Sequence, residues 1–313
     1  MATTRITLTP RENQLRDLLL DVARYIDESK EIKEKLELRF AGGWVRDKLL
    51  SIPSHDIDTA INAMTGYHFS EKMQEYLKNE ENMKKHCLEA KDLGNLHKIL
   101  ANPEKSKHLE TATTKIFGFD VDFVNLRKET YSEDSRNPQM EFGTAEEDAL
   151  RRDATINALF YNLHSDQVED FAGGLEDLRD KRIRTPLGPK TTFMDDPLRV
   201  LRLIRFASRL GFKIDAETEN CMSDPAVMEA LRLKISRERV GTEVEKMLRG
   251  WQFDYVMWLF YLLRLSQAKA PKMLFISLID LASIQLSSQT QLSKESLTPV
   301  QRSGIPSTTA SIS

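Results

Sequence analysis

Residues 38–59 constrain the fold of this chain more than any other segment. They combine a short apolar run, a break at Gly42 and Gly43, an amphipathic stretch and a second run that carries Asp56 and Asp58. On a β-strand, carboxylates at positions i and i+2 share one face, where they repel unless a cation lies between them. A glycine pair before a helix lets backbone N–H groups approach an anion. The segment therefore predicts a strand–turn–helix–strand unit that binds a nucleoside triphosphate and a divalent cation.

Composition limits the classes of protein that this chain can represent. Its 313 residues, 30% charged and 40% hydrophobic, suffice for a sizeable core and a second module. Two cysteines exclude a disulfide framework or an ordinary zinc site, and a formal net charge of −3 argues against general coating of nucleic acid. Early acidic residues argue against a mitochondrial transit peptide. We expect a cytoplasmic protein without a membrane partner, and leave mitochondrial or nuclear pools and the oligomeric state open.

Four regions are expected along the chain: an N-terminal helix in 1–35, a head domain in 36–180, a helical neck in 181–250, and an atypical apolar segment with a disordered tail in 251–313. Within the head, residues 66–115 are rich in Lys, Glu, Asn and His and have weak periodicity. This is typical of a solvated, mobile insertion, which is compatible with a lid over a nucleotide.

A third carboxylate is expected from residues 115–126, which alternate as a strand and place Asp120 and Asp122 at i and i+2. If this strand pairs beside Asp56 and Asp58, Asp122 is the better candidate because its neighbours are apolar. The alternative, an ordinary polar residue at a strand edge, remains open at this point.

Two further segments gather charge in patterns that allow two interpretations. Residues 145–161 predict a helix on which Arg152, Asp153 and Asn157 share a face, either as a functional group or as a surface salt-bridge ladder. Residues 195–210 predict a helix closed by Gly211, along which Arg199, Arg202, Arg205 and Arg209 recur. A solvated basic stripe, with Asp196 as N-cap before Pro197, is one interpretation of this helix.

The other interpretation assigns Asp196 and Arg199 to base recognition. A carboxylate beside a guanidinium offers an acceptor and then a donor, which matches the amino group and ring nitrogen of cytosine or adenine. Uracil and guanine present the reverse order and would leave buried polar groups unpaired, which costs about 1–3 kcal/mol for each group. The pair could therefore select C and A without a nucleic-acid template. A last helix is expected over 234–250, with Ser236 as its N-cap.

Five motifs in a fixed order carry a resemblance to a known family: Gly-Gly-x-Val-Arg-Asp, His-Asp-Ile-Asp-Thr, Arg-Arg-Asp-Ala-Thr-Ile-Asn-Ala-Leu, Asp-Asp-Pro-Leu-Arg-Val-Leu-Arg and Ile-Ser-Arg-Glu-Arg-Val-Gly-Thr-Glu. The set resembles the class II tRNA nucleotidyltransferases, the CCA-adding enzymes of the polymerase-β-like superfamily, and looks most like the fungal or plant type. It covers about residues 10–250. The resemblance implies an α+β fold, in which a nucleotidyltransferase head with a small mixed sheet and helices precedes an all-α neck.

The resemblance also implies roles for individual residues. Asp56 and Asp58 look like the metal-binding catalytic carboxylates, to which Asp122 is added as the candidate described above. Asp153 is similar to the residue that reads the ribose 2′-hydroxyl, and Asp196 and Arg199 fall on the positions that pair with the incoming base. The complete expected nucleotide-binding set is Gly42, Gly43, Arg46, Arg152, Asp153, Asn157, Asp196, Arg199, Arg202 and Arg205.

The function implied is template-independent addition of CCA to tRNA 3′ ends from CTP and ATP, with release of pyrophosphate and two Mg²⁺ ions as cofactors. The insertion 66–115 resembles the flexible element that the family uses for A addition. Residues 251–313 match none of the body and tail that hold tRNA in the family, which leads us to expect a truncated or alternatively spliced product. Two alternatives are kept: a poly(A)-polymerase-type relative, and a nucleotide- or RNA-binding protein without turnover.

Overall fold

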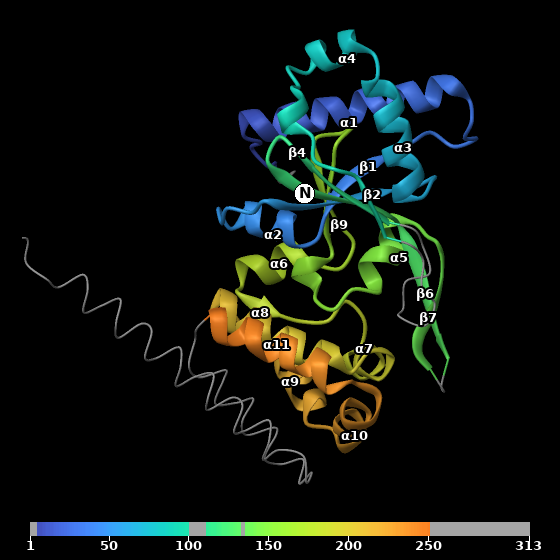
Figure 1. Cartoon of the computed structure of the whole chain (residues 1–313). Helices are drawn as coiled ribbons and strands as arrows, with labels where there is room; N and C mark the ends of the chain where they lie inside the picture. Colours follow the sequence, from blue (N-terminus) through green and yellow to red (C-terminus); the bar gives the residue numbers. More distant parts are fainter. Residues whose placement is uncertain (1–4, 100–110, 133–134, 251–313) are drawn as a thin grey trace, which may run out of the picture. The chain divides into compact units, whose positions relative to one another are not determined.

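The computed structural model describes residues 5–99, 111–132 and 135–250, which all belong to one compact unit (Figure 1). Our expectations for residues 251–313, and for residues 100–110 of the insertion, lie outside the described residues. Within the described part, no helix is both long and apolar enough to cross a membrane.

A seven-stranded mixed sheet forms the centre of the head, in the order β3-β4-β5-β2-β1-β8-β9. Strands β2 and β5 are parallel, whereas the other neighbours are antiparallel. The strands are β1 (Leu38–Ala41), β2 (Asp56–Ile61), β3 (His97–Ile99), β4 (Thr111–Ile116), β5 (Phe119–Asn125), β8 (Leu159–Asn162) and β9 (Gln167–Asp170). Beside this sheet, β6 (Arg127–Ser132) and β7 (Ser135–Phe142) form a separate two-stranded ribbon. The sheet confirms the α+β class of the head.

Helix α1 (Pro10–Ser29) confirms the expected N-terminal helix. Thr9 and Glu12 form a capping box at its start, and Leu15, Leu18, Val22 and Ile26 are among the residues of its buried face. Figure 1 shows α1 and α3 (Gly66–Leu77) on one side of the sheet and α2 (Gly43–Leu49) with α5 (Ala145–Leu150) on the other.

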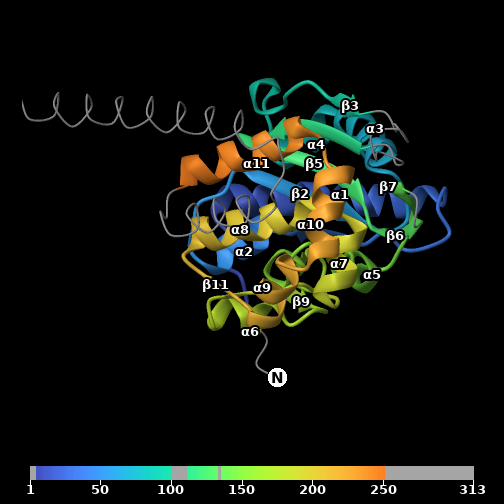
Figure 2. The ribbon, with the colours of Figure 1, turned by 90° about the horizontal axis from the view of Figure 1, so that it is seen from below.

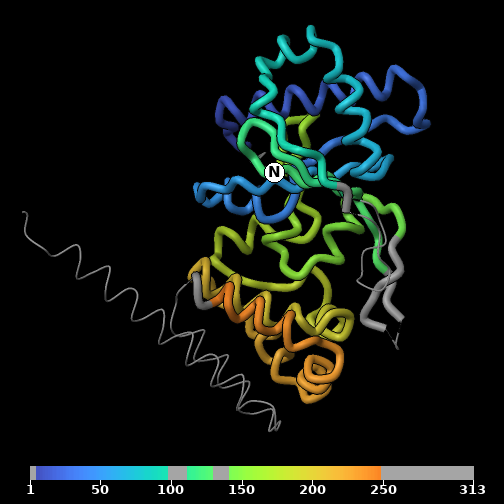
Figure 3. The backbone as a smooth tube through the Cα atoms, in the orientation of Figure 1, coloured from blue at the N-terminus to red at the C-terminus, as the bar shows by residue number. Residues whose placement is uncertain are grey.

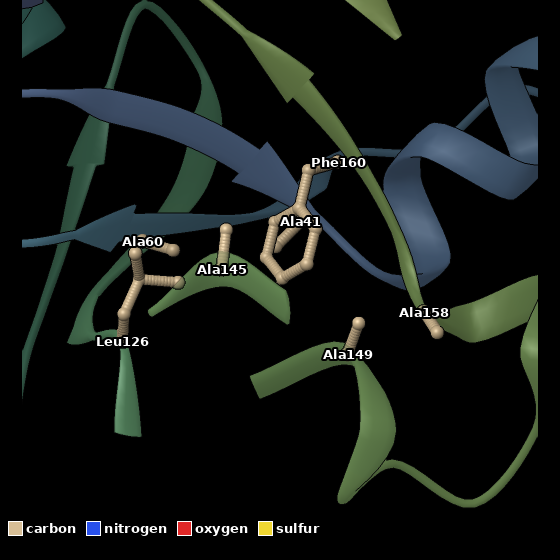
Figure 4. Close-up of a cluster of buried hydrophobic side chains, with 7 residues drawn as sticks. All are labelled: Ala41, Ala60, Leu126, Ala145, Ala149, Ala158 and Phe160. Atoms are coloured by element: carbon tan, nitrogen blue, oxygen red, sulfur yellow. The ribbon is translucent and has the colours of Figure 1, made fainter. Parts of the chain in front are cut away.

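The side of the sheet that faces α5 is packed with small residues. Ala145 and Ala149 of α5 lie in one buried cluster with Ala41, Ala60 and Phe160 of the sheet (Figure 4). Because alanine side chains add little bulk, the helix can approach the strands closely and bring the residues that follow it to the end of β2 and β8.

The expectation of a loop over the whole of 66–115 is wrong for its first part. Helix α3 occupies Gly66–Leu77, and α4 (Glu80–Lys85) and a short 3₁₀ turn at Ala90–Asp92 follow before β3 joins the sheet. Phe69, Met73 and Tyr76 are buried at helical spacing. The charged residues between them obscured this face in the sequence. A Cβ on Gly66 would meet the carbonyl oxygen of Phe123 at 1.9 Å, so the helix needs glycine where it meets β5.

Two other predicted elements are divided in the structure. The strand expected over 115–126 contains a turn at Phe117 and Gly118, both with positive φ, so that β4 ends and β5 begins within it. The helix expected over 145–161 is correct only to Leu150. A 3₁₀ turn at Thr155–Asn157 follows, and β8 then pairs with β1, because Leu159–Asn162 is fully buried and satisfies its backbone in the sheet.

The neck is helical apart from a two-residue parallel strand pair, β10 (Arg182–Ile183) with β11 (Lys213–Ile214). Its helices are α7 (Pro189–Asp195), α8 (Leu198–Leu210), α9 (Ala216–Met222), α10 (Pro225–Lys234) and α11 (Arg237–Gly250), and α6 (Gly174–Arg179) leads into them. Figure 3 shows the chain passing from the head into these helices, and Figure 2 shows α8 beside α11, with which it is in contact. Gly211 closes α8 in the left-handed conformation, as expected.

Candidate active site

The acidic residues predicted from the two strands meet at one edge of the sheet. In the parallel register of β2 and β5, Asp56 lies opposite Asp120 and Asp58 lies opposite Asp122. Asp56 and Asp58 are exposed to solvent while Ile57 between them is buried, as the period of a strand requires. Asp122 is therefore a neighbour of Asp58, whereas Asp120 forms an ion pair with Lys115 at 2.6 Å. We call Asp56, Asp58 and Asp122 the acidic edge.

The pKa of Asp58 is raised above its ordinary value. Solvent reaches this side chain, but the protein surrounds its carboxyl on most sides, and the loss of hydration is the largest cause. Arg152 opposes the rise, while the charges of Asp122, Asp148 and Asp56 add to it. Ionisation of Asp58 is therefore opposed first by burial and then by the neighbouring acids.

Gly42 joins the acidic edge to the arginines of the site. It begins α2 with φ +69°, a conformation that favours glycine, and its N–H donates to the carbonyl of Leu159. A Cβ at this position would lie 2.6 Å from Nη1 of Arg152 and 3.8 Å from Oδ2 of Asp58. A Cβ added to Gly43 would lie nearest to Nη2 of Arg46, at 3.6 Å. The glycine pair is therefore a point of close approach between backbone, carboxylate and guanidinium.

Asn157 connects three of the predicted nucleotide-binding residues. Its side-chain oxygen accepts a hydrogen bond from Arg46, its backbone carbonyl accepts one from Nη1 of Arg152 at 3.0 Å, and its Nδ2 donates to Asp153 at 3.0 Å. The predicted group is brought together, but not by a shared helical face. The turn between α5 and β8 brings these side chains together, which corrects the helical interpretation of this segment.

Asp153 is buried and paired with the neck. Its Oδ2 accepts from Nε of Arg202, on α8, at 2.5 Å. Burial by itself would raise the pKa of Asp153, but the charge of Arg202, hydrogen bonds from Asn157 and Arg202, and the charge of Arg199 hold that pKa well below its usual range. A carboxylate in this environment stays ionised at neutral pH.

The two residues expected to read the base have partners within the protein. Asp196 accepts from the backbone N–H of Leu198 at 3.2 Å and from Nη2 of Arg239 at 3.2 Å, but the N-cap of α8 is Pro197 and not Asp196, which corrects that expectation. Arg199 is buried, and its Nη2 donates to the carbonyl of Arg151 at 2.7 Å. Asp196 and Arg199 are close in the chain, but the structure does not show them as an open pair.

The interpretation of α8 as a solvated basic stripe is wrong for Arg199 and Arg205, while Arg202 is ion-paired but its side chain remains 39% exposed. Arg199 is buried, Arg202 pairs with Asp153, and Arg205 pairs with Glu243 of α11 at 2.6 Å. Arg209 alone of these four is classed as exposed. The aromatic ring of Phe206 also lies under Arg46, Arg202 and Arg205, with centroid distances of 5.5, 5.7 and 4.3 Å.

Asp148 belongs to this site and was not predicted from the sequence. It is buried, its Oδ2 accepts from Nε of Arg152 at 2.9 Å, and it also pairs with Arg151. Burial opposes its ionised form, but Arg152 and Arg151 keep the pKa of Asp148 below its ordinary value. The signal that could have found it is the i, i+4 spacing of Asp148 and Arg152.

A metal ion fits the acidic edge, although the described residues contain no cluster of three or more Asp, Glu, His or Cys that could hold one unaided. Mg²⁺ commonly binds one or two carboxylates together with waters and substrate phosphates, so a complete protein cage is not required. The pKa of Asp58 is raised first by burial and then by the acids beside it, and a bound cation would favour its ionised form. A separate hollow, lined by Leu49, Leu175, Glu176, Leu178 and Arg179, contains none of the predicted site residues.

Comparisons with known proteins agree on one family. Residues 38–184 match the family described as the poly(A) polymerase head domain. The chain is 64% identical over 245 residues to nucleotidyltransferase lcsQ of Purpureocillium lilacinum, covering 78% of this chain and 41% of that protein. It is 57% identical over 248 residues to the mitochondrial CCA tRNA nucleotidyltransferase of Saccharomyces cerevisiae, covering 79% and 44%.

Solved structures show the same fold. A CCA-adding enzyme in its apo form superposes with a TM-score of 0.64 at 26% identity, covering 82% of this chain and 53% of that chain. The Thermotoga maritima CCA-adding enzyme, complexed with tRNA, gives a TM-score of 0.59 at 26% identity, covering 82% and 52%.

The mixed sheet with its acidic edge and the helices that follow are the architecture of a polymerase-β-like nucleotidyltransferase. Within that class, the chain belongs to the class II CCA tRNA nucleotidyltransferase family and is similar to fungal members. It spans less than half of the length of the first two curated relatives, at 41% and 44%.

Proposed function

We propose that this chain carries the nucleotidyl-transfer centre of a CCA-adding enzyme, which adds C, C and A to tRNA 3′ ends from CTP and ATP and releases pyrophosphate. The observation that carries the proposal is the meeting of carboxylates with an arginine: Asp58, in register with Asp122, lies beside Gly42, where an added Cβ would be 2.6 Å from Nη1 of Arg152. This arrangement gives a triphosphate both a metal-binding edge and a cationic side. Relatives with solved structures are described as complexes with tRNA, CTP and ATP.

In this mechanism Asp56 and Asp58 would hold Mg²⁺, with Asp122 as the third carboxylate of the edge. When bound, Mg²⁺ lowers the pKa of a hydroxyl nucleophile and stabilises charge on the transferred phosphate and on pyrophosphate. Gly42 leaves the backbone open where a side chain would block the approach between Asp58 and Arg152. Arg152 and Arg46 then place positive charge on the triphosphate, for which the planar guanidinium is well suited.

Binding of the base requires an exchange of partners in the neck. Arg199 donates to the carbonyl of Arg151, so the base would compete for a donor that is already oriented. Asp196 keeps unused acceptor sites, because a carboxylate can accept about four hydrogen bonds and two partners are seen here. We infer that Asp153, held ionised by Arg202, accepts from the ribose 2′-hydroxyl.

A primer-extension assay tests the proposal. The full chain is incubated with tRNA lacking its 3′ CCA, Mg²⁺, CTP and ATP, and the product length is measured at nucleotide resolution. Three added nucleotides are expected. A long adenylate tail would instead support the poly(A)-polymerase type, as the name of the matching family allows.

CTP binding without any product would support a nucleotide-binding protein without turnover. This outcome would mean that residues 10–250 retain the nucleotide site and that turnover needs more than this chain, which spans 41% and 44% of two relatives, supplies. We also propose the division into a head at 36–180 and a neck at 181–250, which expression of residues 1–250 alone would test. The cytoplasm, with a mitochondrial pool, is our proposed location because relatives include enzymes named as mitochondrial; fractionation of cells that express the tagged chain would test it.

A further inference from the structure

We propose that Arg239, at the start of α11, is a positioning residue that orients the Asp196 carboxylate toward the incoming base. The inference rests on the proposed function, because it gives Arg239 a part in base selection. Nη2 of Arg239 donates to Oδ2 of Asp196 at 3.2 Å, and the backbone N–H of Leu198 donates to Oδ1 at 3.2 Å. Each carboxylate oxygen therefore has one fixed donor.

These two contacts define what Asp196 can recognise. An ionised carboxylate only accepts hydrogen bonds. Because two donors already fix the orientation of the Asp196 carboxylate, its remaining acceptor sites point in defined directions. The amino group of cytosine or adenine can donate to such a site. The carbonyl oxygen that uracil or guanine presents at the same position cannot donate, and it would face a negative charge. Arg239 thus orients Asp196 to accept a hydrogen bond from the amino group of the base.

The structure separates this role from that of holding the helices together. Arg239 and Glu243 lie four residues apart, so both project from one face of α11 toward α8. The Glu243–Arg205 pair is almost buried, with side chains 5% and 12% exposed, and it is suited to hold α11 on α8. The Arg239–Asp196 pair is 41% and 22% exposed. Ion pairs as accessible as this contribute little to stability, so orientation of Asp196 is the better explanation of its presence.

The second base-reading residue is held by contacts other than Arg239. Arg199 donates to the carbonyl of Arg151 in the head and to that of Thr192 in α7, at 2.7 and 3.4 Å, and it lies 3.8 Å from Glu129 of the head. Loss of Arg239 should therefore disturb the reading of the amino group and leave Arg199 in place. It should also leave the triphosphate contacts of Arg46 and Arg152 unchanged. A merely structural role of Arg239 would weaken all ligands alike.

Equilibrium binding with three nucleotides in Mg²⁺ tests the inference. The probes are CTP, UTP and the triphosphate of 2-pyrimidinone riboside, which is cytidine without its amino group. For Arg239→Gln we expect the preference for CTP over the 2-pyrimidinone nucleotide to fall by about tenfold, as the loss of one charge-assisted orienting contact would cause. Binding of pyrophosphate should not change. Arg239→Lys should recover part of the preference, because it restores a cationic donor.

Arg232→Gln is the matched control, because Arg232 lies on the neighbouring helix α10 and pairs with the exposed Glu229. It should bind all probes as the parent chain does. If the parent chain prefers CTP and Arg239→Gln keeps the same preference, the inference is wrong and the proposed function stands. The inference is also wrong if Arg239→Gln weakens every probe, pyrophosphate included, by the same factor. A parent chain without preference for CTP over UTP would overturn the proposed function, and the inference with it.

Discussion

Asp58 and Asp153 are carboxylates of the same site, yet the protein treats their charges in opposite ways. Asp58 lies among acids, and loss of hydration together with Asp122, Asp148 and Asp56 raises its pKa despite Arg152. Asp153 is buried more completely, but Arg202 and Asn157 hold its pKa well below the usual range. The head thus disfavours ionisation of Asp58, whereas Arg202 of the neck and Asn157 favour ionisation of Asp153.

The difference shows which part of the site depends on a ligand. The Asp153 network is complete within the chain, since its partners come from the turn after α5 and from α8. The acidic edge brings like charges together, since register places carboxylates side by side and these acids, together with burial, raise the pKa of Asp58. Carboxylates whose pKa is shifted by burial and by specific charged neighbours are candidates for functional sites. Substitutions at Asp58 and at Asp153 test the two carboxylates separately, and a substitution at Gly42 tests the close approach between the acidic edge and Arg152.

The largest effect is expected for Asp58→Asn in the primer-extension assay. Loss of one carboxylate from the acidic edge should lower the rate of CMP addition by at least about 1,000-fold, or about 4 kcal/mol, because metal-assisted transfer depends on that charge. Asp120→Asn is the control, since Asp120 is on β5 and pairs with Lys115. Its rate should change less than about twofold, as expected for an exposed ion pair. Equal losses in both variants would refute the assignment of the acidic edge.

Asp153→Asn should produce the largest loss of stability. Removal of a buried charge that faces Arg202 is expected to lower the free energy of unfolding by about 2–3 kcal/mol at pH 7. Because the folded-state pKa of Asp153 is depressed, its contribution is fully present above the unfolded value of about 4 and is lost progressively as pH falls from that value to the folded-state pKa. Urea unfolding at pH 7 and at pH 3 measures this. A difference between parent and variant that is as large at pH 3 as at pH 7 would contradict the interpretation.

Gly42→Ala tests the close approach of the Gly42 backbone to Arg152 and Asp58. The new Cβ would lie 2.6 Å from Arg152 Nη1 in a backbone conformation that favours glycine, so we expect destabilisation of about 1–3 kcal/mol and a large loss of CTP binding. Gly241→Ala is the matched control, because Gly241 lies inside α11 and an added Cβ there would meet no neighbouring atom within 4 Å. It should stabilise the protein by about 0.5–1 kcal/mol. Thermal unfolding compares the two, and a shift of the same sign in both would contradict this account.

The smallest effect is a gain in stability for Asp58→Asn. The folded-state pKa of Asp58 is raised, so the ionised side chain destabilises the folded state at neutral pH, and this penalty disappears as pH falls through that pKa. The melting temperature of the variant should slightly exceed that of the parent at pH 8 and approach it near pH 4. Solvent access to Asp58 keeps the effect small. Added Mg²⁺ should raise the melting temperature of the parent more than that of the variant.

Much of the acidic edge was predictable because its geometry is local. A period of two places Asp56 and Asp58 on one face of β2 whatever the strand pairs with. Asp122 required one more fact, the parallel register of β2 and β5, which the sequence left open. Helix α3 was missed because charged residues between Phe69, Met73 and Tyr76 concealed its buried face. The helix after Leu150 was wrongly extended because strand pairing with β1 outweighed helical propensity.

The sequence by itself determined the features that depend on only a few neighbouring residues. These are the capping box of α1, the glycine turn before α2 and the alternation of β2. Tertiary structure decided which charges meet. Arg202 and Asp153 are 49 residues apart, and Arg239 and Asp196 are 43 apart. Such pairs depend on how α8 and α11 pack beside the turn that carries Asp153, and periodicity along one element has no information about that packing. For this reason the sequence indicated which residues serve the site, and the fold assigned their partners.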